Sequence, residues 1–593
     1  DNVYIIALHN EIPVTSTKSD ANGKFQLLKL KAGTYKLKAF VINYNYLVVG
    51  PFELKDGQTI TKDFSLKPKP AELIVDDLEV VGDVREENVS KVSNYYPSGS
   101  RKVKCDAYGG AAYNVSYSND ATYVEHNTES YDVINENNFK EVKNDPLSTL
   151  SVDVDRAAYS NVRRFINQNT LPHKDVVRIE EMVNYFDYDY PQPKDEHPFS
   201  VNAELHECPW NNQHQLLMLG LQGKEMQSEE IPASNLTFLI DVSGSMNSAN
   251  KLGLLKKAFR ILVNNLREKD RVAIVVYAGA AGTVLESTSG KDKAKIIAAL
   301  DNLSAGGSTA GGEGIKLAYK IAMQNFIKDG NNRVILATDG DFNVGASSNA
   351  EMVDLIKQKK ESGVFLTILG FGMGNYKDSR MEQISNAGNG NYAYIDNILE
   401  AKKMFDKELW GTLFTIAKDV KIQIEFNPAK VKGYRLIGYE NRLLNKEDFN
   451  DDKKDAGEIG SGHTVTALYE IIPADSDETV SNVDPLEYTT NSIKNSANML
   501  TVKLRYKDPD KDESKLIVAR YKSSDISGKT ISNNFKLASA VAQFGMLLRD
   551  SEHKGSASFE KTLAWARDAS SDDKYGYRNE FVKLVEVAEL LKK

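Results

Sequence analysis

Hydrophobic residues change their spacing along the chain, and the changes predict its elements. Between residues 234 and 410, short apolar runs alternate with stretches in which apolar residues recur every three or four positions. The runs are typical of buried parallel strands, and the stretches predict helices that cover them. The predicted strands are 236–240, 272–277, 334–337, 365–369 and 392–395, and the predicted helices are 252–266, 294–303, 315–327 and 352–360. This order predicts a doubly wound, mostly parallel α/β sheet.

Strand patterns flank this block on both sides. The predicted strands are 199–208 and 215–221 before it, and 420–426 and 500–506 after it. We expect the two groups to pair in a β-sandwich into which the α/β block is inserted. Helical spacing returns from residue 533, and we expect the apolar stripe over 535–548 to lie in a core.

The first 145 residues have a different character. Residues 1–70 contain turn signals and an alternating stretch over 32–39, which predict a small β-sandwich. Residues 71–145 are rich in Ser, Asn, Tyr, Gly and acidic residues with little periodicity, and they predict a flexible linker. Six regions are therefore expected: 1–70 (β module), 71–145 (linker), 146–233 (N-terminal extension), 234–410 (α/β domain), 411–530 (sandwich partner region) and 531–593 (C-terminal helices).

Composition excludes several classes of protein. The 593 residues include 74 Lys and Arg against 83 Asp and Glu, a net charge of −9, which argues against a nucleic-acid binder. No apolar run approaches the roughly 20 residues that span a bilayer, so we predict no transmembrane segment. Two cysteines, Cys105 and Cys208, exclude a disulfide framework and a Cys-rich zinc site, and their pairing is left open. The chain starts inside a strand pattern, so we expect a longer natural N-terminus from which an export signal is removed.

Oxygen-bearing side chains follow two predicted strands of the α/β block. Asp241, Ser243 and Ser245 follow strand 236–240, Asp339 follows strand 334–337, and Thr309 lies in a Gly-rich loop before a helix. Loops at the carboxyl ends of such strands can meet at one edge of the sheet. They supply only oxygens, two of them charged, which is the ligand set that hard divalent cations prefer. A position that these residues leave vacant on the cation would favour an incoming carboxylate.

The α/β block resembles a von Willebrand factor type A domain. Its metal-ion-dependent adhesion site is matched in order and position by Asp241, Ser243, Ser245, Thr309 and Asp339. The resemblance implies Mg²⁺, with Mn²⁺ or Ca²⁺ as alternatives, and an unidentified partner protein that supplies an Asp or Glu. The alternative is a vestigial site in which Asp241 and Asp339 cap helix N-termini.

The flanks extend the resemblance. Residues 150–165 and 178–186 resemble the N-terminal extension of a bacterial subfamily of these proteins, and 436–442 and 544–549 resemble its C-terminal extension. Residues 1–70 resemble a carboxypeptidase regulatory-like module whose usual first strand is missing. This resemblance implies a binding or spacer module and does not imply peptidase activity. These resemblances imply a protein of the bacterial cell envelope, periplasmic or at the surface, with lipid anchoring of the full-length chain left open.

The sequence thus predicts a metal-dependent, adhesion-type binding protein that is not an enzyme. Two alternatives stay open: a metal-assisted hydrolase with Asp339 or Asp341 as base, and a scaffold subunit for a motor ATPase. Asp153 and Asp155 could form a second metal pair, but ion pairing or capping is the favoured interpretation. Residues 527–530 suggest a phosphate-binding loop but lack its first glycine, because residue 523 is serine.

Overall fold

The computed structural model describes residues 4–66 and 129–592, apart from short gaps. The gaps are 10–11, 21–23, 28–29, 41–46, 57, 62–64, 153–154, 279–280, 308–310, 341–348, 374–376, 455, 481–495 and 510. The chain divides into two units, residues 1–119 and 120–593. Most of the predicted linker, including Cys105, lies outside the described residues.

The first unit contains one antiparallel sheet. Its strands, in the order β2-β1-β3-β4, are β1 (Tyr4–His9), β2 (Ile12–Lys18), β3 (Gly33–Phe40) and β4 (Leu47–Leu54). Alternate residues of the central strands face one small core, as the period of two in a strand requires. The buried members are Ile5, Ala7, Tyr35, Leu37 and Ala39.

The second unit contains the predicted α/β sheet. The strand order is β11-β10-β9-β12-β13-β14, and all neighbours are parallel except the edge strand β11. The strands are β9 (Ser234–Asp241), β10 (Arg271–Tyr277), β11 (Ala281–Ser289), β12 (Asn331–Thr338), β13 (Phe365–Phe371) and β14 (Tyr392–Ile395). The predicted fold class is confirmed, although β11 was not foreseen.

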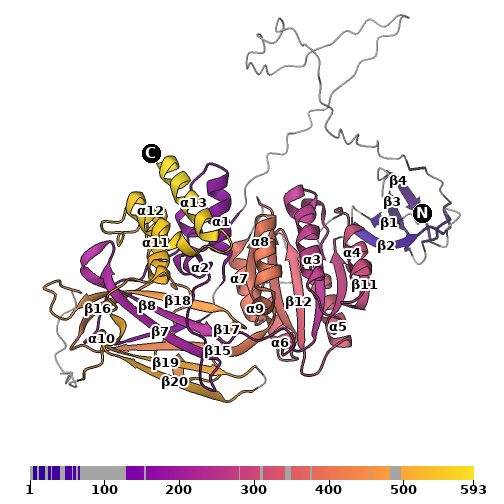
Figure 1. The fold of residues 1–593 in the computed structure, drawn as a ribbon. Coiled ribbons are helices and arrows are strands. Elements are labelled where there is room, and N and C mark those ends of the chain that lie inside the picture. The colour runs from indigo at the N-terminus through magenta and orange to yellow at the C-terminus, as the bar shows by residue number, and fades with distance from the viewer. Residues whose placement is uncertain are drawn as a thin grey trace, which may run out of the picture. The chain divides into compact units, whose positions relative to one another are not determined.

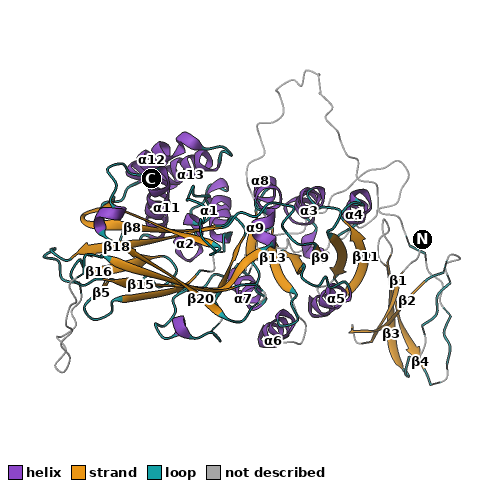
Figure 2. Cartoon of the chain, turned by 60° about the horizontal axis from the view of Figure 1, so that its bottom comes forward, coloured by secondary structure: helices purple, strands orange, loops and turns teal. Residues whose placement is uncertain are grey.

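Helices cover both faces of this sheet (Figure 2). One face carries α3 (Leu254–Asn264), α4 (Lys293–Asp301) and α8 (Ile398–Lys402), and α9 (Leu409–Leu413) packs into the same core. The other face carries α5 (Gly311–Gln324), α6 (Asn349–Lys360) and α7 (Asp378–Ala387). Burial on both faces explains why the central strands are continuous apolar runs rather than alternating ones.

The rest of the second unit forms a β-sandwich, called here the frame. One sheet has the order β17-β15-β19-β20, with β6 also paired to β15, and the other has the order β5-β16-β18-β8-β7. The strands are β5 (Lys140–Glu141), β6 (Leu147–Ser151), β7 (Phe199–Cys208), β8 (Asn211–Gly223), β15 (Thr415–Phe426), β16 (Val431–Ile437), β17 (Gly457–Gly460), β18 (Thr464–Pro473), β19 (Leu500–Lys507) and β20 (Ser514–Tyr521). Because β8 pairs with β18, strands from before and after the α/β block meet as predicted.

Five helices cover the outer face of the second sheet of the frame (Figure 1). They are α1 (Ala157–Asn167), α2 (Ile179–Val183), α11 (Asn533–Arg549), α12 (Phe559–Asp568) and α13 (Tyr577–Lys592). In β8, Leu216 and Met218 pack against these helices, whereas Leu217 and Leu219 face the sandwich interior. The predicted core stripe of 535–548 is confirmed as part of α11. A further short helix, α10 (Ser523–Ile526), ends just before the residues that suggested a phosphate-binding loop.

Residues 129–145, placed in the linker by their composition, make defined contacts, because β5 pairs with β16 and Glu129 forms an ion pair with Arg164. Cys208 is buried and forms no disulfide within the described residues. None of the helices in the described part of the chain has the length and apolar character to cross a membrane.

Candidate metal centre

The first of the predicted ligand loops, residues 241–245 and called here the first ligand loop, begins where strand β9 ends. The eight residues of β9 are all buried, so the sheet holds Asp241 in place at its carboxyl edge. The Ser243 backbone N–H donates to Asp241 Oδ1 at 2.8 Å, which folds the loop back on the carboxylate. The hydroxyl oxygens of Ser243 and Ser245 lie 3.0 Å apart. Asp241 and Ser243 are buried while Ser245 is exposed, so the loop runs from the interior to the surface.

The second carboxylate follows the neighbouring strand. Strands β12 and β9 are parallel with Ala337 opposite Ile240, so Asp339 and Asp241 emerge at the same edge. The Thr338 hydroxyl donates to Asp241 Oδ2 at 3.3 Å and links the two strand ends. Like Asp241, Asp339 is fully buried. Two carboxylates and two adjacent hydroxyls are therefore gathered by two chain segments at one edge of the sheet.

The Gly-rich loop reaches the same place. The Gly306 N–H donates to the Val242 carbonyl at 2.8 Å, and the Gly244 N–H donates to the Gly307 carbonyl at 3.0 Å. These bonds fasten residues 306 and 307 to the first ligand loop. Thr309 follows two positions later and lies outside the described residues, so its place among the ligands stays a prediction.

Burial makes it costly for the carboxylates of the site to carry their negative charge. The pKa of Asp241 is raised to about 6, because desolvation and the nearby charge of Asp339 outweigh the hydrogen bonds from Ser243 and Tyr277 that lower it. The Tyr277 hydroxyl donates to Asp241 Oδ2 at 3.0 Å. A divalent cation would compensate such charges, because buried carboxylates are costly without a positive partner.

The side chains fit a hard cation. Within the described chain, no group of three or more His, Cys, Asp and Glu side chains could hold a metal, so a site here depends on hydroxyls together with two carboxylates. An all-oxygen set that includes serine hydroxyls suits Mg²⁺, which keeps part of its water shell and tolerates few protein ligands. Asp241, Ser243, Ser245 and Asp339 are thus the described residues that could hold it.

Three residues that contact the carboxylates of the site were not predicted from the sequence. Tyr277 ends strand β10 directly opposite Asp241, so the parallel register could have identified it. Thr338 immediately precedes Asp339, and its position at the end of strand β12 could have indicated that it lies at the site. Lys251 donates to Asp339 Oδ2 at 3.0 Å, and nothing in the local sequence pattern indicates that contact.

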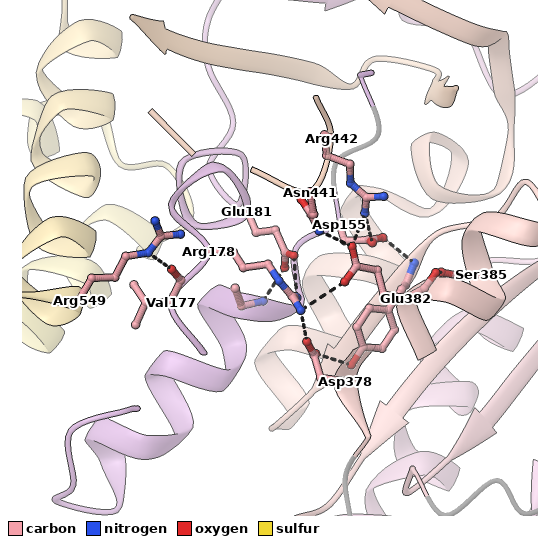
Figure 3. Close-up of polar contacts among 12 residues, drawn as sticks. Asp155, Val177, Arg178, Glu181, Asp378, Glu382, Ser385, Asn441, Arg442 and Arg549 are labelled. Atoms are coloured by element: carbon pink, nitrogen blue, oxygen red, sulfur yellow. Dashed lines mark hydrogen bonds and ion pairs between the residues drawn. The ribbon is translucent and has the colours of Figure 1, made fainter. Parts of the chain in front are cut away.

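A buried ion network joins the α/β domain to the frame (Figure 3). Arg178, just before α2, lies 3.0 Å from Glu181, 2.5 Å from Asp378 and 3.2 Å from Glu382. The last two residues belong to α7 of the α/β domain. Arg442, which follows the α/β domain in the sequence, lies 2.7 Å from Glu382.

Asp155 completes this network from the N-terminal side. It lies 2.9 Å from Arg442 and accepts a hydrogen bond from the Tyr392 N–H. The favoured interpretation of Asp155 as an ion-pairing residue is confirmed, and Asp153 lies outside the described residues. Both extensions therefore contact one helix of the inserted domain.

A second cluster holds the helix that leaves the α/β sheet. Arg163 of α1 lies 2.5 Å from Asp396 and 2.6 Å from Glu400, on either side of the start of α8. The same guanidinium lies 2.9 Å from Glu580 of α13. Arg163 is almost fully buried, and its guanidinium links α8 to α1 and α13, two of the helices that cover the frame.

Comparisons with known proteins agree with this architecture. The sequence pattern described as "von Willebrand factor type A domain" matches residues 235–407. The pattern "von Willebrand factor" matches residues 125–218, and "Uncharacterized protein YfbK, C-terminal" matches residues 411–591.

One relative covers most of the chain. The uncharacterized protein YfbK of Escherichia coli is 44% identical over 477 residues, which cover 78% of this chain and 81% of that protein. Among solved structures, a von Willebrand factor type A protein from Catenulispora acidiphila is 15% identical with a TM-score of 0.37, covering 66% of this chain and 91% of that one. BatB from Bacteroides thetaiotaomicron is 22% identical with a TM-score of 0.26, covering 30% of this chain and 97% of that one.

Proposed function

The chain belongs to the family of the Escherichia coli protein YfbK, bacterial proteins with a von Willebrand factor type A domain and a C-terminal extension, and we propose that it binds a partner protein through a divalent cation. Type A domains are typically modules of protein interaction and adhesion. The single observation that carries the proposal is the position of buried Asp241 and Asp339 at the same edge of the sheet as two adjacent serine hydroxyls.

The cation would be held by Asp241, Ser243, Ser245 and Asp339, with Thr309 as a further proposed ligand. When bound, it would present an electrophilic position to a carboxylate of the partner. Exposure of Ser245 beside the buried Ser243 supports access from the surface. We propose Mg²⁺ as the cation and an Asp or Glu side chain as the group that the partner supplies.

We propose binding rather than catalysis at this site. A serine nucleophile needs an adjacent general base, but the described hydrogen bonds of the Ser243 hydroxyl run to Ser245 and Asp241 and not to a histidine. Asp341, the base considered for a hydrolase, lies outside the described residues. The proposed location is the bacterial cell envelope, which cell fractionation with an antibody to the chain would test.

Calorimetric titration with Mg²⁺ tests the proposal. The wild-type chain is expected to bind one Mg²⁺, and Asp241→Asn is expected to lose binding because it removes a charged ligand. Asp301→Asn is the matched control, because Asp301 lies half-exposed at the end of α4 and pairs with Arg260. Equal titrations of the wild type and Asp241→Asn would refute the site. Capture of partners from an envelope extract, with and without EDTA, would then test whether binding needs the metal.

A further inference from the structure

Lys251 places a positive charge inside the proposed cation site. Its ammonium nitrogen lies 3.0 Å from Asp339 Oδ2. Lys251 is buried, with a relative exposure of 9%, and Asp339 is fully buried. An ion pair so far from solvent is screened weakly, so it affects any ion nearby.

The fold makes room for this lysine in two ways. Lys251 interrupts a short helical turn, Ala249–Gly253, with a backbone φ of −113° and ψ of −105°. Its aliphatic stem lies against Gly372, where a β-carbon would come within 2.4 Å of Lys251 Cγ and Cε. Gly372 also has a φ of +76°, which a residue with a side chain rarely adopts. The stem therefore occupies a space that exists because residue 372 is glycine.

Lys251 changes the net charge of the proposed cation site. Asp241 and Asp339 contribute −2, and Lys251 reduces the sum of these three side chains to −1. A divalent cation would bring the sum to +1, whereas the same site without the lysine would become neutral. The lysine should therefore repel the cation and, once the cation is bound, strengthen attraction for an anion.

We propose that Lys251 is a built-in counter-ion that lowers cation affinity and gives the loaded site a net positive charge for a carboxylate ligand. This inference rests on the proposed function. It adds the residue that sets the balance between binding of the cation and binding of the partner's carboxylate. It assigns Lys251 a positioning and electrostatic role, without contact to the cation. The two effects have opposite signs, so one substitution distinguishes this role from a structural one.

The test uses Mn²⁺ as the metal probe and acetate as the carboxylate probe, on the purified chain. Lys251→Met keeps most of the stem and removes the charge, and it is expected to bind Mn²⁺ on the order of tenfold more tightly. At saturating Mn²⁺, the same variant is expected to need several-fold more acetate to change the Mn²⁺ paramagnetic resonance spectrum. Lys251→Arg keeps the charge and should behave more like the wild type in both measurements.

Lys256→Met is the matched control. Lys256 donates to the carbonyls of Asp301 and Leu303, away from the two carboxylates of the site. If circular dichroism shows that Lys251→Met does not fold, Lys251→Gln gives the same charge change with a group that can still donate to Asp339. Unchanged or weaker Mn²⁺ binding by the neutral variant would overturn the inference while leaving the cation site intact. No binding by the wild type would overturn the proposed function and this inference together.

Discussion

Arg178 Nη2 lies 2.5 Å from Asp378 Oδ2, and this buried contact joins residues 200 positions apart in the sequence. Arg178 comes from the segment before the α/β domain, and Asp378 begins helix α7 within it. Glu181 and Glu382 also contact the same guanidinium. The Arg178 guanidinium therefore forms ion pairs with three buried carboxylates at the junction between the inserted domain and the frame.

Removing the positive charge of Arg178 should destabilise the folded chain strongly. Arg178→Met leaves the three carboxylates with less positive charge in a place where water cannot compensate, and we expect a loss of about 3–5 kcal/mol in the free energy of unfolding. Arg260→Met is the control, because the Arg260–Asp301 pair is half-exposed and should contribute about 0–1 kcal/mol. Urea denaturation followed by tryptophan fluorescence measures both. A similar small loss for the two variants would contradict the role of the network.

Acid should destabilise the frame through His463. Burial, together with the nearby charge of Arg156, lowers the pKa of His463 to about 3. Its Nε2 has no hydrogen-bond partner among the described residues. Because the unfolded chain takes up this proton near pH 6.5 and the folded chain does not, stability is present above pH 6.5 and falls as the pH drops toward 3.

The expected slope from this one group is about 1.4 kcal/mol per pH unit between those values. His463→Leu should show a smaller slope over the same range, measured by urea denaturation at a series of pH values. His173→Leu is the control, because the His173 side chain is 70% exposed. Identical slopes for the wild type and His463→Leu would show that His463 is not held neutral.

Gly372→Ala should disturb the contact between Lys251 and Asp339. The new β-carbon would overlap the Lys251 stem, and the φ of +76° adds a cost of about 1–2 kcal/mol. We expect a lower midpoint of thermal unfolding. Gly282→Ala is the control, since no atom lies within 4 Å of the β-carbon that it would gain. Equal midpoints for the two variants would argue against a tight slot around the lysine.

Magnesium should stabilise the folded chain. A ligand that binds only the folded state adds about 2.7 kcal/mol at a concentration 100 times its Kd. The wild type should therefore unfold at a higher temperature as Mg²⁺ is raised, whereas Asp339→Asn should respond little because it lacks a charged ligand. Asp301→Asn should respond like the wild type. A rise of the same size in Asp339→Asn would mean that Mg²⁺ stabilises the chain elsewhere.

The positions of Asp241 and Asp339 at one edge of the sheet could be predicted because their signals are local. Asp241 and Asp339 directly follow apolar strands, and parallel strands bring their carboxyl ends to one edge. The pairing of the strands around the α/β block was predicted on similar grounds, from the position of strand patterns before and after it. The edge strand β11 was missed, since its exposed and buried residues do not form a clear apolar run.

The charged neighbours could not be predicted, for a physical reason. Lys251 meets Asp339, and Arg178 meets Asp378, only after the sheet has brought distant segments together. A single sequence records that these residues are charged but not which opposite charge each one contacts. Glu129 illustrates the same limit, because its ion pair with Arg164 lies in a stretch whose composition suggested a linker.

We propose above all that Asp241, Ser243, Ser245 and Asp339 hold one divalent cation. A crystal of the chain grown with Mn²⁺, measured at a wavelength where manganese scatters anomalously, tests it most directly. We expect a single anomalous peak within coordination distance of the oxygens of the first ligand loop. No peak at this edge of the sheet, with Mn²⁺ present at a concentration that saturates calorimetric binding, would contradict it.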